Sequence, residues 1–144
     1  MPKYPTSFAC KTIFIDLKKL RKALKFAYYL MGKGDRIVYG TPMMQAHAQC
    51  LRTFVKAQEF KDEQYEYLKE FCGDFAVLRM ELDLVTEENI IHFAKHKGED
   101  KLPELQREIF EAVDKIDVAL AKWKSSVRKG KTLAAEGQGS TKED

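Results

Sequence analysis

Four long segments of the sequence repeat apolar residues at intervals of three and four positions, and no other feature limits the fold as strongly. This spacing gathers the apolar side chains on one face of an α-helix, where they can pack against other helices. The segments are approximately 7–31, 41–58, 62–85 and 102–129. Because the connections between them are short, we predict an all-α, up-down-up-down four-helix bundle over residues 1–130.

Local signals predict where these helices begin and end. Gly32 and Gly34 are expected to terminate the first helix, and Thr41-Pro42 supplies an N-cap and a first helical residue for the second. We allow for a short helical piece over 35–40, and for a third helix that ends near Val85 or continues to about residue 92. Residues 131–144 are small, polar and aperiodic, which predicts a disordered tail.

Composition restricts the class of protein further. The chain has 144 residues, a length typical of a single domain. Its 8 Gly and 4 Pro disfavour a turn-rich β fold. Three widely spaced cysteines, Cys10, Cys50 and Cys72, indicate reduced thiols packed as small apolar residues. The longest uncharged stretch, 37–51, is too short and too polar to span a bilayer, and no signal peptide is recognisable. We expect a cytoplasmic protein that does not contact a membrane.

The net charge of +3 conceals an uneven distribution. Residues 1–36 hold nine Lys or Arg and two Asp, whereas residues 59–100 hold five basic and twelve acidic residues. The helical spacing of Lys11, Lys18, Lys22 and Lys25 places them on one face of the first helix. A second basic cluster ends the fourth helix: Lys122, Lys124, Arg128, Lys129 and Lys131.

In an antiparallel bundle these two basic clusters are expected to meet, and a continuous basic surface suits a phosphate backbone. Two other interpretations stay open. Lysines on a helix are commonly a solvated face, and the surface also suits an acidic protein, including the acidic segment of a second copy.

Two arginines are less easily explained as solvated residues. Arg79 lies close to the apolar stripe of the third helix, which predicts either a phosphate or interface contact or an ion pair. The partner in that pair would be an Asp or Glu of its own or a neighbouring helix, with Asp83 as the nearest candidate. Arg52 lies in the second helix, and we treat it as a second candidate contact.

The sequence offers little for catalysis or for metal binding. A di-iron bundle requires Glu-x-x-His motifs, and none is present. His92 and His96, with Glu88 one turn earlier, form at most the edge of a metal site, and we interpret them as surface residues. His47 is predicted to be a hydrogen-bonded core residue. Phosphate-binding loops and nucleophile motifs are also missing, so we expect neither an enzyme nor a cofactor.

Several short motifs resemble the Avd family, the accessory variability proteins of diversity-generating retroelements, which belong with the four-helix-bundle proteins of rRNA intervening sequences. The likeness rests on Gly34-Asp35-Arg36-Ile37 before the second helix, on Phe75-Ala-Val-Leu-Arg79 followed by Leu82, and on the stretch from Ile109 to Trp123 with its basic end. Asp83 stands where the family has a second basic residue.

This resemblance implies a non-enzymatic homopentamer that binds a reverse transcriptase and its template RNA or RNA/DNA hybrid through a basic surface. The candidate contact residues are Lys11, Lys18, Lys22, Lys25, Arg36, Arg52, Arg79, Lys122, Lys124, Arg128 and Lys129. The alternative is a helical protein–protein interaction module that binds no nucleic acid. A metal-dependent bundle enzyme is the third hypothesis.

Overall fold

The computed structural model describes residues 11–87 and 102–137, and within the last helix the side chains of residues 104–127. The described elements are all helical. In chain order they are α1 (Thr12–Leu30), α2 (Lys33–Asp35), the π-helical turn η1 (Arg36–Gly40), α3 (Thr41–Glu59), the 3₁₀ turn η2 (Lys61–Glu63), α4 (Gln64–Glu87) and α5 (Leu102–Gly137).

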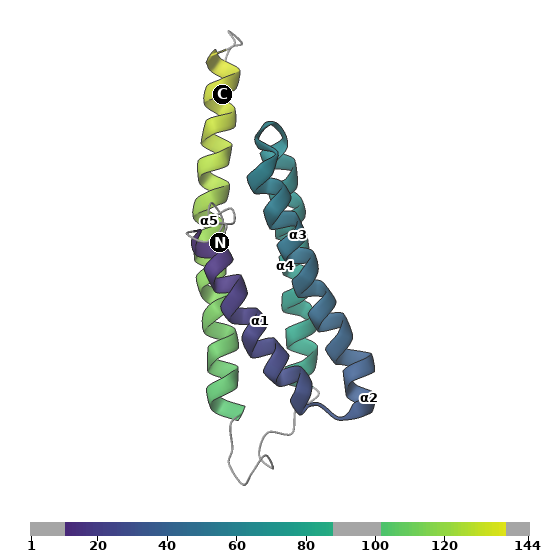
Figure 1. Ribbon diagram of the computed structural model, residues 1–144. Helices are drawn as coiled ribbons and strands as arrows, with labels where there is room; N and C mark the ends of the chain where they lie inside the picture. The colour runs from purple at the N-terminus through teal and green to yellow at the C-terminus, as the bar shows by residue number, and fades with distance from the viewer. Residues whose placement is uncertain (1–10, 88–101, 138–144) are drawn as a thin grey trace, which may run out of the picture.

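The four long helices form the predicted up-down-up-down bundle. Figure 1 shows α1 and α4 running in one direction, and α3 and α5 running in the other. The closest neighbours are α3 with α4 and α1 with α5, while α1 also packs on α3 and α4 on α5. Each helix therefore contacts the next one along the chain, and α5 closes the bundle against α1.

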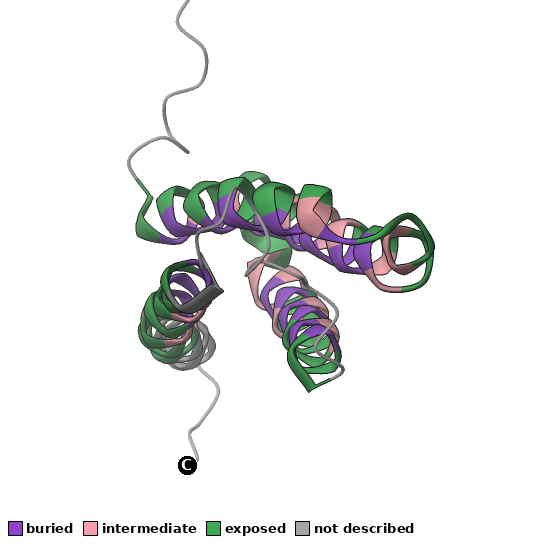
Figure 2. Cartoon of the chain, turned by 90° about the horizontal axis from the view of Figure 1, so that it is seen from below, coloured by how far each residue is buried: buried purple, intermediate pink, exposed green. Residues whose placement is uncertain are grey.

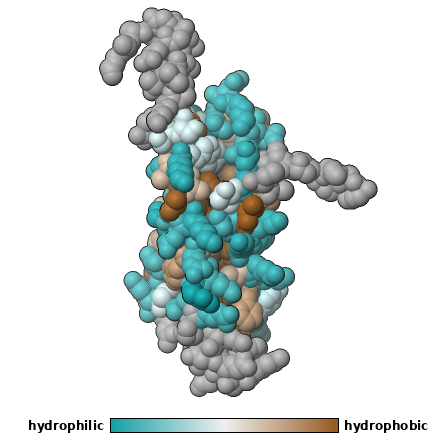
Figure 3. Space-filling view, turned by 90° about the vertical axis from the view of Figure 1, so that its left-hand side faces the viewer, coloured by the Kyte–Doolittle hydropathy of each residue, from teal (hydrophilic) through white to brown (hydrophobic). Residues whose placement is uncertain are grey.

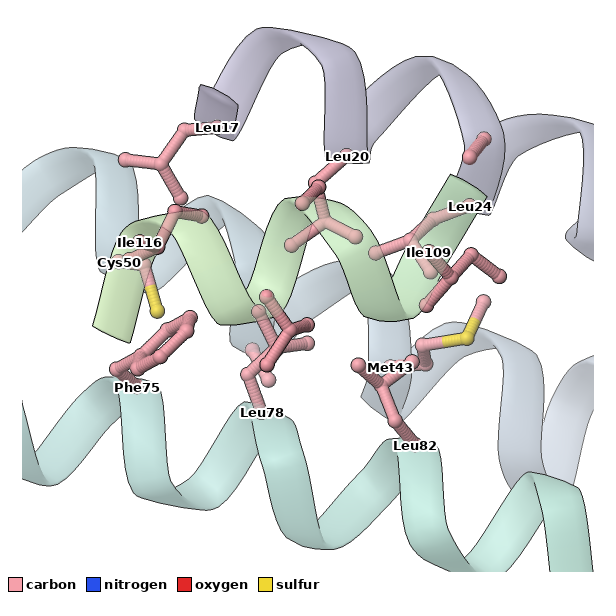
Figure 4. Packing of buried hydrophobic residues seen from close by; sticks show 14 of the residues in the cluster. Leu17, Leu20, Leu24, Met43, Cys50, Phe75, Leu78, Leu82, Ile109 and Ile116 are labelled. Carbon is pink, nitrogen blue, oxygen red and sulfur yellow. The ribbon is translucent and has the colours of Figure 1, made fainter. Parts of the chain in front are cut away.

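The core is formed by the apolar faces that the periodicity predicts. Figure 4 shows leucines of α1, Met43 and Cys50 of α3, Phe75 of α4 and Ile116 of α5 pointing toward one another. The largest fully buried side chains include Phe54, Phe71 and Phe75. In Figure 2 the buried surface of each helix faces the neighbouring helices, and the exposed surface faces outward.

His47 is the predicted core histidine, and this prediction is confirmed. Its ring is fully buried, and Nε2 lies 2.8 Å from the carbonyl oxygen of Leu17 on α1. Because a carbonyl only accepts, Nε2 carries the proton and donates it. Nδ1 is buried and has no hydrogen-bond partner among the described residues. Burial lowers the pKa of His47, and the nearby charge of Arg21 lowers it further against the opposing effect of the Leu17 bond.

The cysteines of the described residues are free thiols, as predicted. Cys50 is buried in the core, and burial raises its pKa to about 12. Cys72 is partly buried. Cys10 lies outside the described residues.

The connection between α1 and α3 differs from the expected glycine-terminated helix. α1 ends because Met31 adopts an extended conformation, and Gly32, with φ −68°, does not take the left-handed conformation of a glycine cap. The predicted helical piece over 35–40 is present as η1, which continues directly into α3. Thr41 therefore makes no N-cap, since Gly40 before it is already helical.

The last helix is longer than predicted. α5 continues to Gly137, past the expected boundary at residue 130, so the first seven residues of the predicted tail are helical. Residues 138–144 lie outside the described part of the chain. Among the described residues, no helix combines the length and the apolar character needed to cross a bilayer.

Candidate nucleic-acid interface

The lysines of α1 lie on its outer face. Lys18, Lys22 and Lys25 are all exposed, on the side of the helix opposite to Leu17, Leu20 and Leu24 in the core. Lys18 also lies over the ring of Phe14, with Nζ 5.5 Å from the ring centre. These lysines therefore share one face of α1, as their helical spacing predicts.

The basic residues of α1 and α5 meet at one point. Lys11, directly before α1, lines the same cavity as Lys122 of α5, and so does Lys115, two turns earlier on α5. This cavity lies at the middle of α5 and not at its end, because α5 has 36 residues and α1 has 19 (Figure 1). Hydrophilic side chains cover most of this side of the molecule, with apolar ones visible between them (Figure 3).

The groove between α1 and α5 also contains carboxylates that the sequence analysis did not single out. Asp16 of α1 is buried in it, and Glu108, Glu111 and Asp114 of α5 line it. The α1 lysines Lys19, Lys22 and Lys25 line the same part of the groove as the two glutamates. The helical spacing of residues 108, 111 and 115 was a signal that these side chains share the face of α5 turned toward α1.

A second, smaller basic group lies on the opposite side of α5. Burial raises the pKa of the Cys72 thiol on α4, and the nearby charges of Lys124 and Arg79 oppose this rise. Arg79 is about half exposed and its Nη1 lies 3.5 Å from Oδ1 of Asp117 on α5. Its guanidinium is 5.3 Å from the ring centre of Phe75. The ion pair considered for Arg79 is therefore present, but its partner is Asp117 of a neighbouring helix and not the nearest candidate, Asp83.

Arg52 is not brought together with Arg79. Its exposed Nη1 donates to Oε1 of Gln49 at 3.0 Å on the same helix, and Gln49 donates in turn to Oδ2 of Asp74 on α4 at 3.4 Å. This chain of contacts holds Arg52 on the surface formed by α3 and α4. It is separate from the groove between α1 and α5.

Arg36 has a structural role that its motif did not reveal. Nε donates to the carbonyl of Tyr28 at 3.1 Å and Nη2 donates to the carbonyl of Tyr29 at 2.7 Å. The guanidinium also lies about 5.5 Å from both tyrosine rings. Because the last carbonyls of a helix have no partner within it, Arg36 serves as the cap of α1.

The remaining candidates lie where the structure gives no side-chain position. Arg128 and Lys129 belong to α5 by their backbone, but their side chains, like that of Lys131, are outside the described residues. Glu88, His92 and His96 are also outside them. Among the described residues, no group of three or more His, Cys, Asp or Glu is arranged to hold a metal ion.

Comparisons with protein-family models, with curated proteins and with solved structures find no match for this chain. The candidate interface is therefore interpreted from its own chemistry. It consists of an exposed lysine face on α1, a lysine-rimmed groove toward α5, and a separate Arg79–Lys124 pair toward α4.

Proposed function

We propose that this chain is a non-enzymatic bundle that binds nucleic acid and assists a reverse transcriptase, the role implied by its resemblance to the Avd family. One observation carries the proposal: α1 has an exposed lysine face, and Lys11 directly before it lines one cavity with Lys115 and Lys122 of α5. Lysines on two adjacent helices can neutralise neighbouring phosphates and release their counterions. The ligand in this proposal is template RNA or an RNA/DNA hybrid.

The charge distribution of the whole chain supports binding of nucleic acid on the α1 side of the bundle. The excess of positive charge lies in residues 1–36, which contain α1, and the excess of negative charge lies in residues 59–100, which contain α4. A polyanion is therefore attracted to the α1 side and repelled from the outer face of α4. Arg79 and Lys124, between α4 and α5, provide a second contact on the border between these two sides.

Arg36 is left out of this proposed contact set. Its guanidinium already donates two hydrogen bonds to backbone carbonyls and stacks on two tyrosines. A phosphate would have to compete with these bonds. The proposal therefore assigns Arg36 to the stability of α1.

The test measures fluorescence polarisation of a labelled structured RNA and of an RNA/DNA hybrid, at about 50 mM and about 200 mM salt. We expect the affinity to fall at least roughly tenfold over this range, as it does when several phosphates are neutralised. Reversing two charges with Lys18→Glu and Lys22→Glu should weaken binding and reduce the salt dependence. Arg79→Ala should have a smaller effect, since it removes one contact.

The matched control reverses two exposed lysines at the other side of the bundle, Lys61→Glu and Lys69→Glu, which changes the net charge equally. It should bind nearly as well as the unchanged chain. If both double variants lose affinity equally, the binding reflects net charge alone and the α1 face is not the interface. Absence of binding at low salt contradicts the proposed function.

The second candidate function, a helical protein-interaction module, is favoured by a different observation. Val77, Met80 and Leu84 of α4 are exposed by 48%, 47% and 37% and follow one another at helical spacing. An apolar stripe of this kind on an outer helix face is typical of a protein contact. It is compatible with the first proposal, because a reverse transcriptase or a second copy of the chain could cover it.

A further inference from the structure

The groove between α1 and α5 holds a cavity of about 630 Å³ beside the start of α1. Its wall includes Phe54 and Trp123, whose rings meet edge to face at 5.9 Å between centres. Lys11, Lys115 and Lys122 also line it. A cavity of this size holds one nucleotide, and an aromatic wall with basic residues nearby is the usual setting for a stacked base and its phosphate.

Asp16 supplies a carboxylate to the wall of this cavity. It is exposed by only 4%, and it makes no hydrogen bond or ion pair with the described residues. It lines both this cavity and a neighbouring one of about 710 Å³ farther along the same groove. Among the described residues the buried side-chain polar atom without a partner is Nδ1 of His47, so the carboxylate oxygens of Asp16 still reach the cavity that they line. Because a carboxylate only accepts, Asp16 suits a ligand that donates hydrogen bonds.

The chemistry of a carboxylate selects among the four bases. Asp16 only accepts, and its two oxygens suit two adjacent N–H donors. Guanine presents such a pair, N1–H and N2–H₂, on its Watson–Crick edge. In adenine and cytosine the amino group stands next to an acceptor nitrogen, and in uracil N3–H stands between two carbonyls. An acceptor facing the carboxylate would be repelled, so the cavity favours guanine.

We propose that this cavity binds a guanine nucleotide of single-stranded RNA, with the base against the partly exposed Trp123, its N1–H and N2–H₂ donated to Asp16, and its phosphate near Lys11 and Lys122. The inference rests on the proposed function, which it refines. The lysine face of α1 attracts RNA of any sequence, and the cavity adds a preference for one base. The RNA segment that it takes is unpaired, because the Watson–Crick edge of the guanine must be free.

Trp123 provides the measurement, because it is the one tryptophan of the sequence. The 5′-monophosphates of guanosine, adenosine, cytidine and uridine are titrated into the full chain, and the fluorescence of Trp123 is followed. We expect saturable binding of the guanosine nucleotide, at least about tenfold tighter than binding of the other three, the discrimination expected of a bidentate contact.

Asp16→Asn tests the role assigned to the carboxylate. The amide replaces one acceptor by a donor, so the preference for guanosine should fall by about tenfold or more. Asp83→Asn is the matched control, since it makes the same charge change on the exposed face of α4 and should keep the preference. If Asp16→Asn does not fold, Lys11→Gln with Lys122→Gln replaces it. This double variant should weaken the binding of all four nucleotides and keep the order of their affinities.

The outcomes separate this inference from the proposed function. Equal affinities for the four nucleotides, or a guanosine preference that survives in Asp16→Asn, overturn the base site even if structured RNA still binds in a salt-dependent manner. A guanosine preference that depends on Asp16, together with no binding of structured RNA at low salt, retains the base site and contradicts the proposed function.

Discussion

At the scale of single residues, His47 links α1 to α3 through one hydrogen bond. Nε2–H donates to the carbonyl of Leu17, and the ring is fully buried between the helices. Burial lowers the pKa of His47, so the ring is neutral in the folded protein at a pH where it is partly protonated in the unfolded chain. The stability of the bundle therefore depends on pH through this residue.

The direction of that dependence follows from proton binding. Below the ordinary histidine pKa of about 6.5, the unfolded chain binds a proton that folded His47 does not bind. The free energy of unfolding should fall as the pH drops from about 7.5 to about 5.5, by at most about 1.4 kcal/mol per pH unit from this residue. Urea unfolding at the two pH values measures the difference, and His47→Gln should reduce it.

The other two histidines supply the control for this prediction. His92→Gln combined with His96→Gln leaves His47 as the remaining histidine of the chain. This double variant should keep the pH dependence of the unchanged protein. If the pH dependence of the unfolding free energy disappears in the double variant, or persists in His47→Gln, it arises from other groups.

Asp16 and Asp83 illustrate which residue roles were predictable. The sequence suggested Asp83 as the nearest candidate partner of Arg79 and indicated no role for Asp16. The structure pairs Arg79 with Asp117 and buries Asp16 instead. Such roles depend on which helix packs beside which, and on the rotation of each helix. Periodicity within one segment fixes neither.

At the scale of secondary structure, the end of α1 depends on a residue of the following segment. α1 stops at Leu30, and the two carbonyls of Tyr28 and Tyr29 accept hydrogen bonds from Arg36. The planar guanidinium reaches both carbonyls and also stacks on the tyrosine rings. A lysine has one ammonium group and no planar guanidinium, so it cannot bond both carbonyls and stack on the tyrosine rings at the same time.

Arg36→Lys therefore distinguishes a cap from a phosphate contact. We expect this variant to lose about 1 kcal/mol of unfolding free energy, because charge-assisted bonds to the carbonyls are lost on a partly exposed site. Its affinity for RNA at fixed salt should stay within about twofold, since the charge is retained. Urea unfolding and fluorescence polarisation measure the two quantities. Undiminished stability with weakened RNA binding would contradict the assignment of Arg36 as a cap.

The helices themselves were predicted well because their signal is local. Leu17, Leu20 and Leu24, or Phe71, Phe75 and Leu78, repeat at helical spacing and are all buried. The ends were predicted less well. Gly32 suggested a glycine cap, whereas Met31 and Arg36 end the helix, and the predicted tail at 131 is helical to Gly137. These ends are decided by contacts between segments or by weak propensities.

At the scale of the whole molecule, the outer face of α4 carries exposed apolar side chains that no described helix covers. Val77, Met80 and Leu84 form an exposed apolar stripe, and the exposed Gly73 continues it by one turn. The acidic segment and the basic α1 face are complementary in charge, which favours self-association. The stripe adds an apolar component, and apolar burial is the main favourable term in association.

We therefore expect the chain to self-associate through α4, with a mass in sedimentation equilibrium that is a multiple of 16.6 kDa. Met80→Glu places a charge at the centre of the stripe, which would be buried without a partner in the assembly. It should raise the dissociation constant at least about tenfold, or leave single chains. Gln45→Glu adds the same charge at an exposed position of α3 and should leave the assembly intact. If the unchanged protein sediments as a single chain, or if both variants dissociate alike, the stripe is not a contact between copies. Its exposed side chains are then the surface on which the protein-interaction function would have to be sought.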